Sequence, residues 1–204
     1  PVELGKLITL EFLDVSENLI SGTLPTELGQ LTSLEYIEID DNWLTGILPT
    51  QLGKITSLQK FDASNNTLSG NLPSELGRWT LLTGMLLHDN LFSGTLPVEL
   101  GQLTALEFIK IDDNFLTGIL PTELGKITVL QKFDASNNWL SGTLPSELGQ
   151  WTALTGMSLY ENVFSGTLPV ELGQLTALEF IEIYDNFLTG ILPTELGKIT
   201  ALQT

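Results

Sequence analysis

Apolar and polar residues alternate over short stretches of this chain, and the same stretch returns with a 24-residue period. In the unit 31–54, the apolar Ile37 and Ile39 are separated by Glu38 and flanked by Tyr36 and Asp40. Alternation over about five residues predicts a short β-strand with one buried side. Because one repeat cannot bury its own apolar side, we expect the strands of successive repeats to stack into a parallel sheet, about 4.8 Å apart.

The second half of each unit carries turn-forming residues. Gly46 permits a tight bend, the following Leu-Pro pair favours extended backbone, and residues 50–53 predict a short helical turn that ends at a glycine. Asn42 lies where the chain leaves the strand, and its amide can bond backbone groups of its own turn and of the next repeat. We therefore expect all eight repeat asparagines to be buried and bonded to backbone: Asn18, Asn42, Asn66, Asn90, Asn114, Asn138, Asn162 and Asn186.

The repeat covers the whole chain. All nine prolines, from Pro1 to Pro193, are separated by the same 24-residue step, and 17 of the 19 glycines follow it as well. This periodicity predicts a single domain, 1–204, of about eight and a half repeats. Both ends resemble interior repeats, so we expect an interior fragment without caps, whose copies associate end to end or which continues further. We expect strands centred near Leu13, Ile37, Phe61, Leu87, Ile109, Phe133, Leu159 and Ile181.

The stretch Leu34-x-x-Ile37-x-Ile39-x-x-Asn42-x-Leu44, continued by a Gly and a Leu-Pro pair, resembles the leucine-rich repeat of the plant-type subclass. That subclass occurs in receptor-like proteins of plants and algae. The resemblance implies an α/β solenoid, a right-handed superhelix or horseshoe with one short parallel strand per 24-residue repeat and short helical turns on the convex side. It also implies a non-catalytic binding surface located outside the cell or at its surface.

A longer period of three repeats lies over the shorter one. Trp79 and Trp151 are three repeats apart, and so are the two glycines outside the 24-residue step, Gly84 and Gly156. Each Trp occupies a core position that holds Leu or Ile in other repeats. The chain therefore resembles a product of duplication in blocks of three repeats.

The net charge of −17 disfavours binding to nucleic acid or to anionic membranes. No apolar run reaches the roughly 20 residues of a membrane span, and no cysteine is present. Seventeen of the 25 acidic residues lie on or beside the predicted strands, where only Lys60, Lys110 and Lys132 oppose them. The other eight form a column on the helical turns, which we expect Lys6, Lys54, Arg78, Lys126 and Lys198 to balance.

The outward strand positions should form the concave face and hold the ligand. We expect the contacts at the aromatic, basic and apolar side chains that interrupt the acidic columns: Phe12, Tyr36, Lys60, Leu86, His88, Phe108, Lys110, Lys132, Tyr160, Phe180 and Tyr184. Gly84 and Gly156 should leave notches beside Phe108 and Lys132 that seat an inserted, basic side chain. The alternative is that both glycines make room for Trp79 and Trp151 or for the neighbours of these residues.

The residue after each repeat asparagine forms a further column, which is apolar in seven of eight repeats: Leu19, Trp43, Thr67, Leu91, Phe115, Trp139, Val163 and Phe187. These side chains either pack against each other as a second, shallow core or form an exposed apolar surface that binds a partner or a glycan. We favour the first alternative.

No motif indicates catalysis, a metal or a cofactor. The only histidine is His88, whose counterpart three repeats later is Tyr160, and no phosphate loop, dinucleotide motif, zinc spacing or calcium loop occurs. An open strand face also lacks the enclosed pocket that shifts a catalytic pKa. We therefore expect no enzyme activity, no cofactor and no metal.

Three functions remain. The first is recognition of a protein or peptide on the concave face, where a basic or repetitive ligand would fit. The second is a structural or adhesive array in a wall or matrix, which the periodic blocks favour. The third is ice binding, because hydroxyl pairs such as Ser21 and Thr23 recur in the turns, although Ile47, Ile119 and Ile191 interrupt them.

Overall fold

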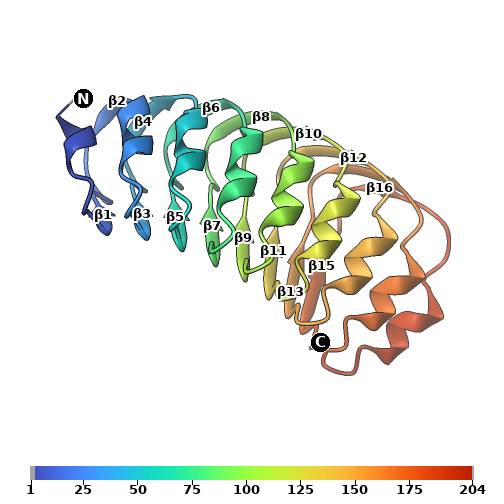
Figure 1. Ribbon diagram of the computed structural model, residues 1–204. Helices are drawn as coiled ribbons and strands as arrows, with labels where there is room; N and C mark the ends of the chain where they lie inside the picture. The colour runs from blue at the N-terminus through green and yellow to red at the C-terminus, as the bar shows by residue number, and fades with distance from the viewer. Residues whose placement is uncertain (1–2, 204) are drawn as a thin grey trace.

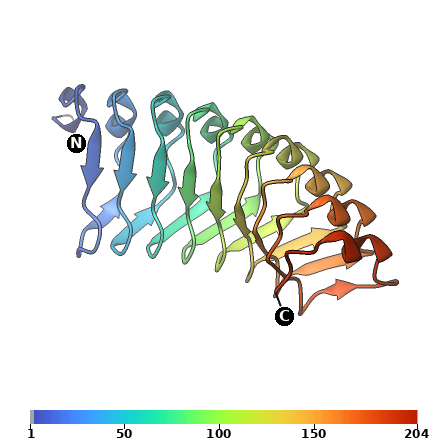
Figure 2. The ribbon, with the colours of Figure 1, turned by 90° about the horizontal axis from the view of Figure 1, so that it is seen from below.

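The computed structural model describes residues 3–203, which form a curved and twisted row of similar coils (Figure 1). Pro1, the first residue of the proline column, lies outside the described residues. Each coil contributes a 3₁₀ helix, and together these helices line one side of the row (Figure 2). In the described part of the chain they are η1 (Leu4–Lys6), η2 (Thr26–Gln30), η3 (Thr50–Lys54), η4 (Ser74–Arg78), η5 (Val98–Gln102), η6 (Thr122–Lys126), η7 (Ser146–Gln150), η8 (Val170–Gln174) and η9 (Thr194–Lys198).

The predicted parallel sheet is present, and we call it sheet A. Its strands pair in chain order with an offset of one full repeat, so that Phe12 pairs with Tyr36 and Tyr36 with Lys60. The strands are β1 (Phe12–Asp14), β3 (Tyr36–Glu38), β5 (Lys60–Asp62), β7 (Gly84–Leu86), β9 (Phe108–Lys110), β11 (Lys132–Asp134), β13 (Gly156–Ser158) and β15 (Phe180–Glu182). The predicted solenoid with short helical turns is thereby confirmed.

Two of the expected strand centres were wrong. Met85 and Met157, rather than Leu87 and Leu159, are the central residues of β7 and β13. The pairing of Met85 with both Phe61 and Ile109 determines this register. Leu87 is the next inward position along the chain, and it is equally buried, so its apolar character alone could not identify the centre.

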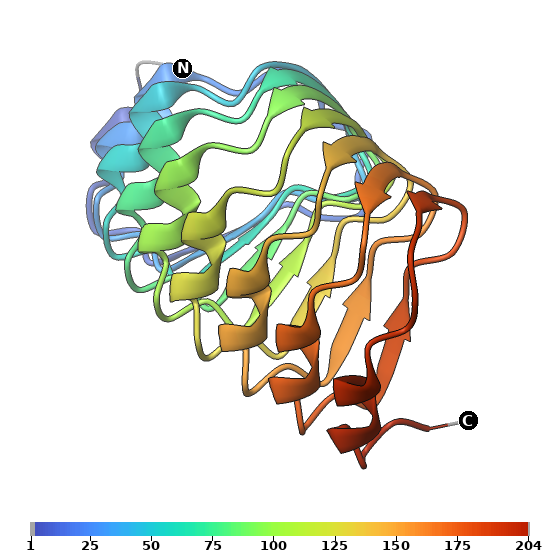
Figure 3. The same ribbon diagram turned by 90° about the vertical axis from the view of Figure 1, so that its right-hand side faces the viewer.

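A second parallel sheet, sheet B, was not predicted from the sequence. It lies along another side of the row, where its strands are visible as short arrows (Figure 3). The strands are β2 (Ser21–Thr23), β4 (Trp43–Gly46), β6 (Thr67–Asn71), β8 (Leu91–Thr95), β10 (Phe115–Gly118), β12 (Trp139–Gly142), β14 (Val163–Gly166) and β16 (Phe187–Leu188). The glycine of the repeated Ser/Thr-Gly pair argued against a strand in the sequence, because glycine usually weakens a strand.

Sheet B differs from sheet A in register. Ser21 pairs with Trp43 and Thr23 with Thr45, an offset that is two positions short of a full repeat. Along the strands of sheet B, equivalent residues of successive coils are therefore displaced by two residues relative to each other. Gly46, in the repeated Ser/Thr-Gly pair, has a φ of 79°, a value that residues with a side chain rarely adopt.

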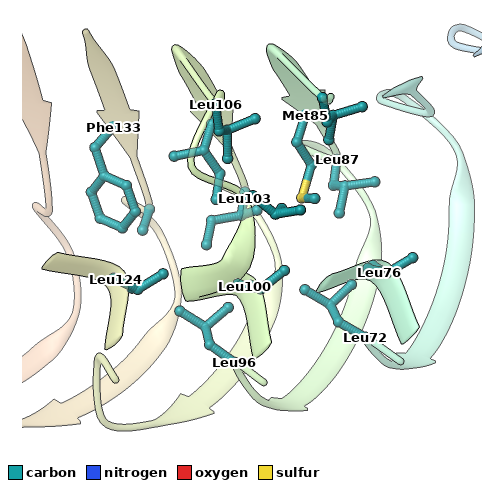
Figure 4. Packing of buried hydrophobic residues seen from close by; sticks show 14 of the residues in the cluster. Leu72, Leu76, Met85, Leu87, Leu96, Leu100, Leu103, Leu106, Leu124 and Phe133 are labelled. Atoms are coloured by element: carbon teal, nitrogen blue, oxygen red, sulfur yellow. The ribbon is translucent and has the colours of Figure 1, made fainter. Parts of the chain in front are cut away.

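The core fills the space between the two sheets and the helices. Leu100, Leu103 and Leu106 of one coil lie between Met85 of the preceding coil and Phe133 of the following coil (Figure 4). Leucine and isoleucine supply most of this core, and each coil covers the apolar edge of its neighbour.

Trp79 and Trp151 are fully buried within this core. Trp79 Nε1 donates a hydrogen bond to Leu52 O at 3.0 Å, and its ring lies 5.0 Å from that of Phe61. Trp151 repeats both interactions with Leu124 and Phe133. The three-repeat period therefore includes the hydrogen bond of the indole.

The asparagine ladder is confirmed in its bonding and corrected in its burial. Asn114 Nδ2 donates to the carbonyl oxygens of Leu87, Ile111 and Asp112, and its Oδ1 accepts from Phe92 N. Six of the repeat asparagines are buried as predicted, but Asn18 is exposed and Asn186 is half-buried. These two lie in the coils closest to the ends of the row, where fewer neighbours cover them.

Candidate ligand-binding surface

The strand face is the outward side of sheet A, and all eleven predicted ligand contacts lie on it or just past the ends of its strands. Six of them, together with Gly84 and Gly156, form one continuous ladder of paired residues: Phe12, Tyr36, Lys60, Gly84, Phe108, Lys132, Gly156 and Phe180. The predicted strip of aromatic and basic side chains is thus a contiguous surface.

Aromatic side chains on the strand face are arranged in pairs. The rings of Phe12 and Tyr36 stack with centroids 4.4 Å apart, and those of Tyr160 and Tyr184 stack at 4.8 Å. Both pairs join neighbouring coils across the outward side of the row. They give the strand face rigid, partly exposed platforms on which apolar groups of a ligand can pack.

The hollow at Gly84 gathers the three lysines of the strand face. Tyr36, Lys60, Thr83, Gly84, Leu86, Phe108, Lys110 and Lys132 line this lysine hollow, which has a volume of about 350 Å³. A Cβ at Gly84 would lie 3.6 Å from Lys60 Cγ and 3.8 Å from Leu86 Cδ1. The glycine therefore opens the hollow and does not make room for Trp79, so that alternative was wrong for Gly84.

The three lysines are not equivalent. Lys60 Nζ lies 2.7 Å from Glu38 Oε1 and 3.8 Å from Asp62 Oδ2, so its charge is largely matched. Lys132 Nζ lies over the ring of Phe180, 4.5 Å from its centroid. Lys110 is exposed and, among the described residues, takes part in no ion pair. Lys110 and Lys132 thus give the hollow a local positive charge, which disfavours the predicted insertion of a basic side chain there.

The notch at Gly156 is different from the one at Gly84. Its hollow of about 300 Å³ is lined by Lys110, Lys132, Phe133, Asp134, Gly156, Ser158 and Phe180. A Cβ at Gly156 would collide with the ring of Phe180, which folds over the glycine. The glycine accommodates this surface ring and not the buried Trp151.

His88 and Asp112 occupy corresponding positions on neighbouring coils beside the lysine hollow. Neither His88 Nδ1 nor Asp112 Oδ1 has a hydrogen-bond partner in the described part of the chain, although both atoms are buried. Burial, followed by the charge of Asp134, raises the pKa of Asp112 to about 6, against the opposing influence of His88 and Lys110. The positive charges of the hollow are therefore accompanied by a carboxyl group that ionises only partly near pH 6.

A second depression lies where the chain passes from sheet A to sheet B, and we call it the edge groove. It has a volume of about 910 Å³. Its lining residues are Asn90, Leu91, Asp113, Asn114, Phe115, Asn137, Asn138, Trp139, Glu161, Asn162, Val163, Asp185, Asn186 and Phe187. The expectation that the apolar column packs as a second core was wrong, since Phe115, Trp139 and Phe187 are more than half exposed.

One wall of the edge groove consists of residues in left-handed backbone conformation. Asp113, Asn137, Glu161 and Asp185 have φ values between 50° and 52°. This conformation is uncommon for residues other than glycine, and Asn and Asp tolerate it best. In the sequence, this wall corresponds to the column of Asp, Asn and Glu residues before each repeat asparagine. The left-handed conformation of these residues was not predicted from the sequence.

The acidic column on the helices is balanced less fully than expected. Lys6 Nζ lies 2.7 Å from Glu3 Oε2. In the described residues, Lys54, Arg78, Lys126 and Lys198 form no ion pair. Within residues 3–203 no group of three or more His, Cys, Asp or Glu side chains is placed to hold a metal ion, and none of the helices is long and apolar enough to cross a membrane.

Comparison with known proteins identifies the repeat. The Leucine Rich Repeat family model matches residues 9–31, 33–55, 57–79 and 129–151. Among curated proteins, none matches this sequence.

Solved structures of plant receptors are similar over the entire chain. The plant peptide hormone receptor RGFR1, in complex with RGF2, is 34% identical over 100% of this chain and 32% of its own, with a TM-score of 0.98. The Arabidopsis receptor kinase HAESA, in complex with the peptide hormone IDA and the co-receptor SERK1, is 30% identical over 99% of this chain and 38% of its own, with a TM-score of 0.80. The chain thus spans about a third of the length of these receptors.

A plant ice-binding protein has a similar structure as well. It is 28% identical over 95% of this chain and 62% of its own, with a TM-score of 0.77. The same solenoid therefore occurs in proteins with different binding partners, so the surface, and not the fold, must indicate the ligand.

Proposed function

The chain is a leucine-rich-repeat solenoid of the plant type, and we propose that it is a non-catalytic recognition module that holds an extended peptide along the strand face, outside the cell. The lysine hollow is the main observation that supports this proposal. Three lysines and two aromatic rings converge on one hollow of an otherwise acidic face. Such a site favours an anionic group of the ligand, for which a peptide offers its terminal carboxylate or an acidic side chain.

The surroundings of the hollow select for the rest of the ligand. Asp134 and Glu182 lie on the outward side of strands β11 and β15 and favour basic side chains. A peptide with one anionic end and basic residues along its length would match both regions. Similar structures include receptors in complex with peptide hormones, which supports a peptide as the ligand.

Labelled basic peptides of about twelve residues, with either a free or an amidated carboxyl end, can test this proposal. We expect the free carboxylate to bind at least tenfold more tightly, and Lys110→Gln with Lys132→Gln to abolish that difference, because the unmatched charges of the hollow are then lost. Lys54→Gln, on helix η3, is the matched control. Equal affinities for both peptides, or no effect of the lysine changes, would contradict the site.

Ice binding is a second candidate because a plant ice-binding protein shares the fold and the predicted hydroxyl pairs lie on sheet B or just past the ends of its strands. The register of sheet B weakens this candidate. Ser21 pairs with Trp43, and Ser93 pairs with Phe115, so large rings stand beside the hydroxyl groups. A flat crystal plane would meet the rings first, and a thermal hysteresis measurement decides the question.

A further inference from the structure

We propose that the edge groove binds a neutral, linear polysaccharide, at a site separate from the lysine hollow. The groove runs across several coils and combines exposed rings on one wall with carboxyl and amide groups on the other. This proposal concerns a different ligand class and a different surface from the peptide proposed above, and it does not depend on it.

The floor of the groove is rigid. It is formed by repeat asparagines such as Asn114 and Asn138, whose amide groups are used in bonds to the backbone. These amide groups are therefore already hydrogen-bonded within the protein, and the two walls must supply the contacts that recognise the ligand. A rigid floor also lowers the entropy that binding costs.

The apolar wall offers a platform at nearly every coil. Phe115, Trp139 and Phe187 expose 51%, 59% and 66% of their surface, and Leu91 and Val163 belong to the same wall. Side chains of this size are seldom left exposed in a row without a partner. A pyranose ring has an apolar C–H face that packs on such platforms.

The polar wall offers hydrogen-bonding groups at the same spacing. Asp113, Asn137, Glu161 and Asp185 each come from one coil, and successive coils are about 4.8 Å apart in the sheets. Carboxylate and amide groups can each bond two neighbouring hydroxyl groups. One coil therefore presents one platform and one polar group, a repeat close to the length of one sugar unit.

Charge selects a neutral polymer. The carboxylates of the polar wall repel an anionic chain, while the adjoining surface of sheet B carries no charged residue in any of its described strands. A cationic chain would find more acidic residues on the strand face than in the groove. A neutral chain with many hydroxyl groups satisfies the polar wall and leaves no charge against sheet B.

Isothermal titration with neutral hexasaccharides of β-linked glucose, mannose and N-acetylglucosamine tests the proposal. We expect at least one of them to bind with an affinity that is unchanged between low and high NaCl, because no charge is matched. Trp139→Ala should weaken binding about tenfold, since a ring platform is removed. Trp43→Ala is the matched control: Trp43 lies in the same column and is 61% exposed, but it does not line the groove.

Each of the following outcomes would overturn the proposal. The first is that no neutral hexasaccharide binds. The second is that Trp139→Ala and Trp43→Ala weaken binding equally. The third is that the groove instead captures a basic peptide with an affinity that falls in salt and depends on Trp139, or that Trp139→Ala removes thermal hysteresis. Lys110→Gln should leave saccharide binding intact, so failure here is distinguishable from failure of the peptide site.

Discussion

Residues 84–112 and residues 156–184 are corresponding segments of the three-repeat blocks, yet their surfaces differ. Each has a glycine at the same position of sheet A, followed by an aromatic residue on the next strand, Phe108 or Phe180. At Gly84 a hollow is open and bordered by three lysines, whereas at Gly156 the ring of Phe180 covers the glycine. The same backbone thus supports two different local chemistries.

A few substitutions account for the difference. Lys110 corresponds to Glu182 in the second segment, where Ser158 Oγ donates a hydrogen bond to Glu182 Oε2 at 2.9 Å. Lys60 pairs with Glu38, but its counterpart Lys132 has Lys110 in place of that acid and lies over Phe180 instead. The three-repeat period places equivalent residues at the same positions, and the charges of neighbouring coils determine what each position does.

The largest expected effect separates two asparagines that make the same bonds. Asn114 and Asn186 are three repeats apart, and each bonds three carbonyl oxygens and one backbone N–H, but only Asn114 is buried. Asn114→Ala should lower the free energy of unfolding by about 3 kcal/mol and Asn186→Ala by about 1 kcal/mol, because water reaches the backbone groups more readily at the second site. Urea unfolding measures the free energy of unfolding of both variants. Equal losses would show that burial of the asparagine does not determine how much stability the substitution removes.

The next effect concerns Asp112, whose counterpart is Tyr184. Its pKa is raised from 3.8 to about 6 in the folded protein, so ionisation opposes folding as the pH rises between these values. Asp112→Asn should therefore be about 1–2 kcal/mol more stable than the unchanged protein at pH 7.5, after allowance for solvent screening of a half-buried group.

The gain from Asp112→Asn should disappear near pH 3, below both pKa values, where the carboxyl group is largely protonated in the folded and the unfolded state. Tyr184→Phe, at the corresponding place where Tyr184 stacks on Tyr160, serves as the control and should show no such pH dependence. A stability difference that stays constant from pH 3 to pH 7.5 would contradict the raised pKa.

A smaller effect distinguishes the two glycines. Gly84→Ala places a Cβ in ordinary van der Waals contact with Lys60 and Leu86 and should stabilise the protein by about 0.5 kcal/mol, because the unfolded chain loses conformational freedom. Gly156→Ala displaces the ring of Phe180 and should give no gain or a slight loss. Thermal unfolding of the two variants provides the comparison, and a reversed order would contradict the description of the notches.

An effect of about the same size is expected for the contact between Lys132 and Phe180. Because both side chains are partly exposed, a double-mutant cycle with Lys132→Gln and Phe180→Leu should give a coupling energy of about 0.5 kcal/mol. The corresponding pair, Lys60 with Phe108, should show no coupling, since Lys60 pairs with Glu38. Equal coupling in both cycles would remove this distinction between the segments.

The 24-residue pattern by itself determined the coil, the strands of sheet A, the helical turns and the bonding of the asparagine ladder. These features follow from the chain because they depend on the order of apolar and polar residues and on turn residues such as Gly46 and Pro49. The strip of aromatic and basic side chains on sheet A was also predictable, since residues one full repeat apart are direct partners there.

Only the tertiary structure decided the surfaces between coils. On sheet B the shorter offset places Ser21 beside Trp43, so columns drawn one full repeat apart do not describe neighbours on that side. Whether a notch is open at Gly84 or covered at Gly156 depends on the direction that side chains of the next coils take. The sequence specifies each repeat locally, whereas grooves and hollows arise from how neighbouring coils shift and which side chains they turn toward each other.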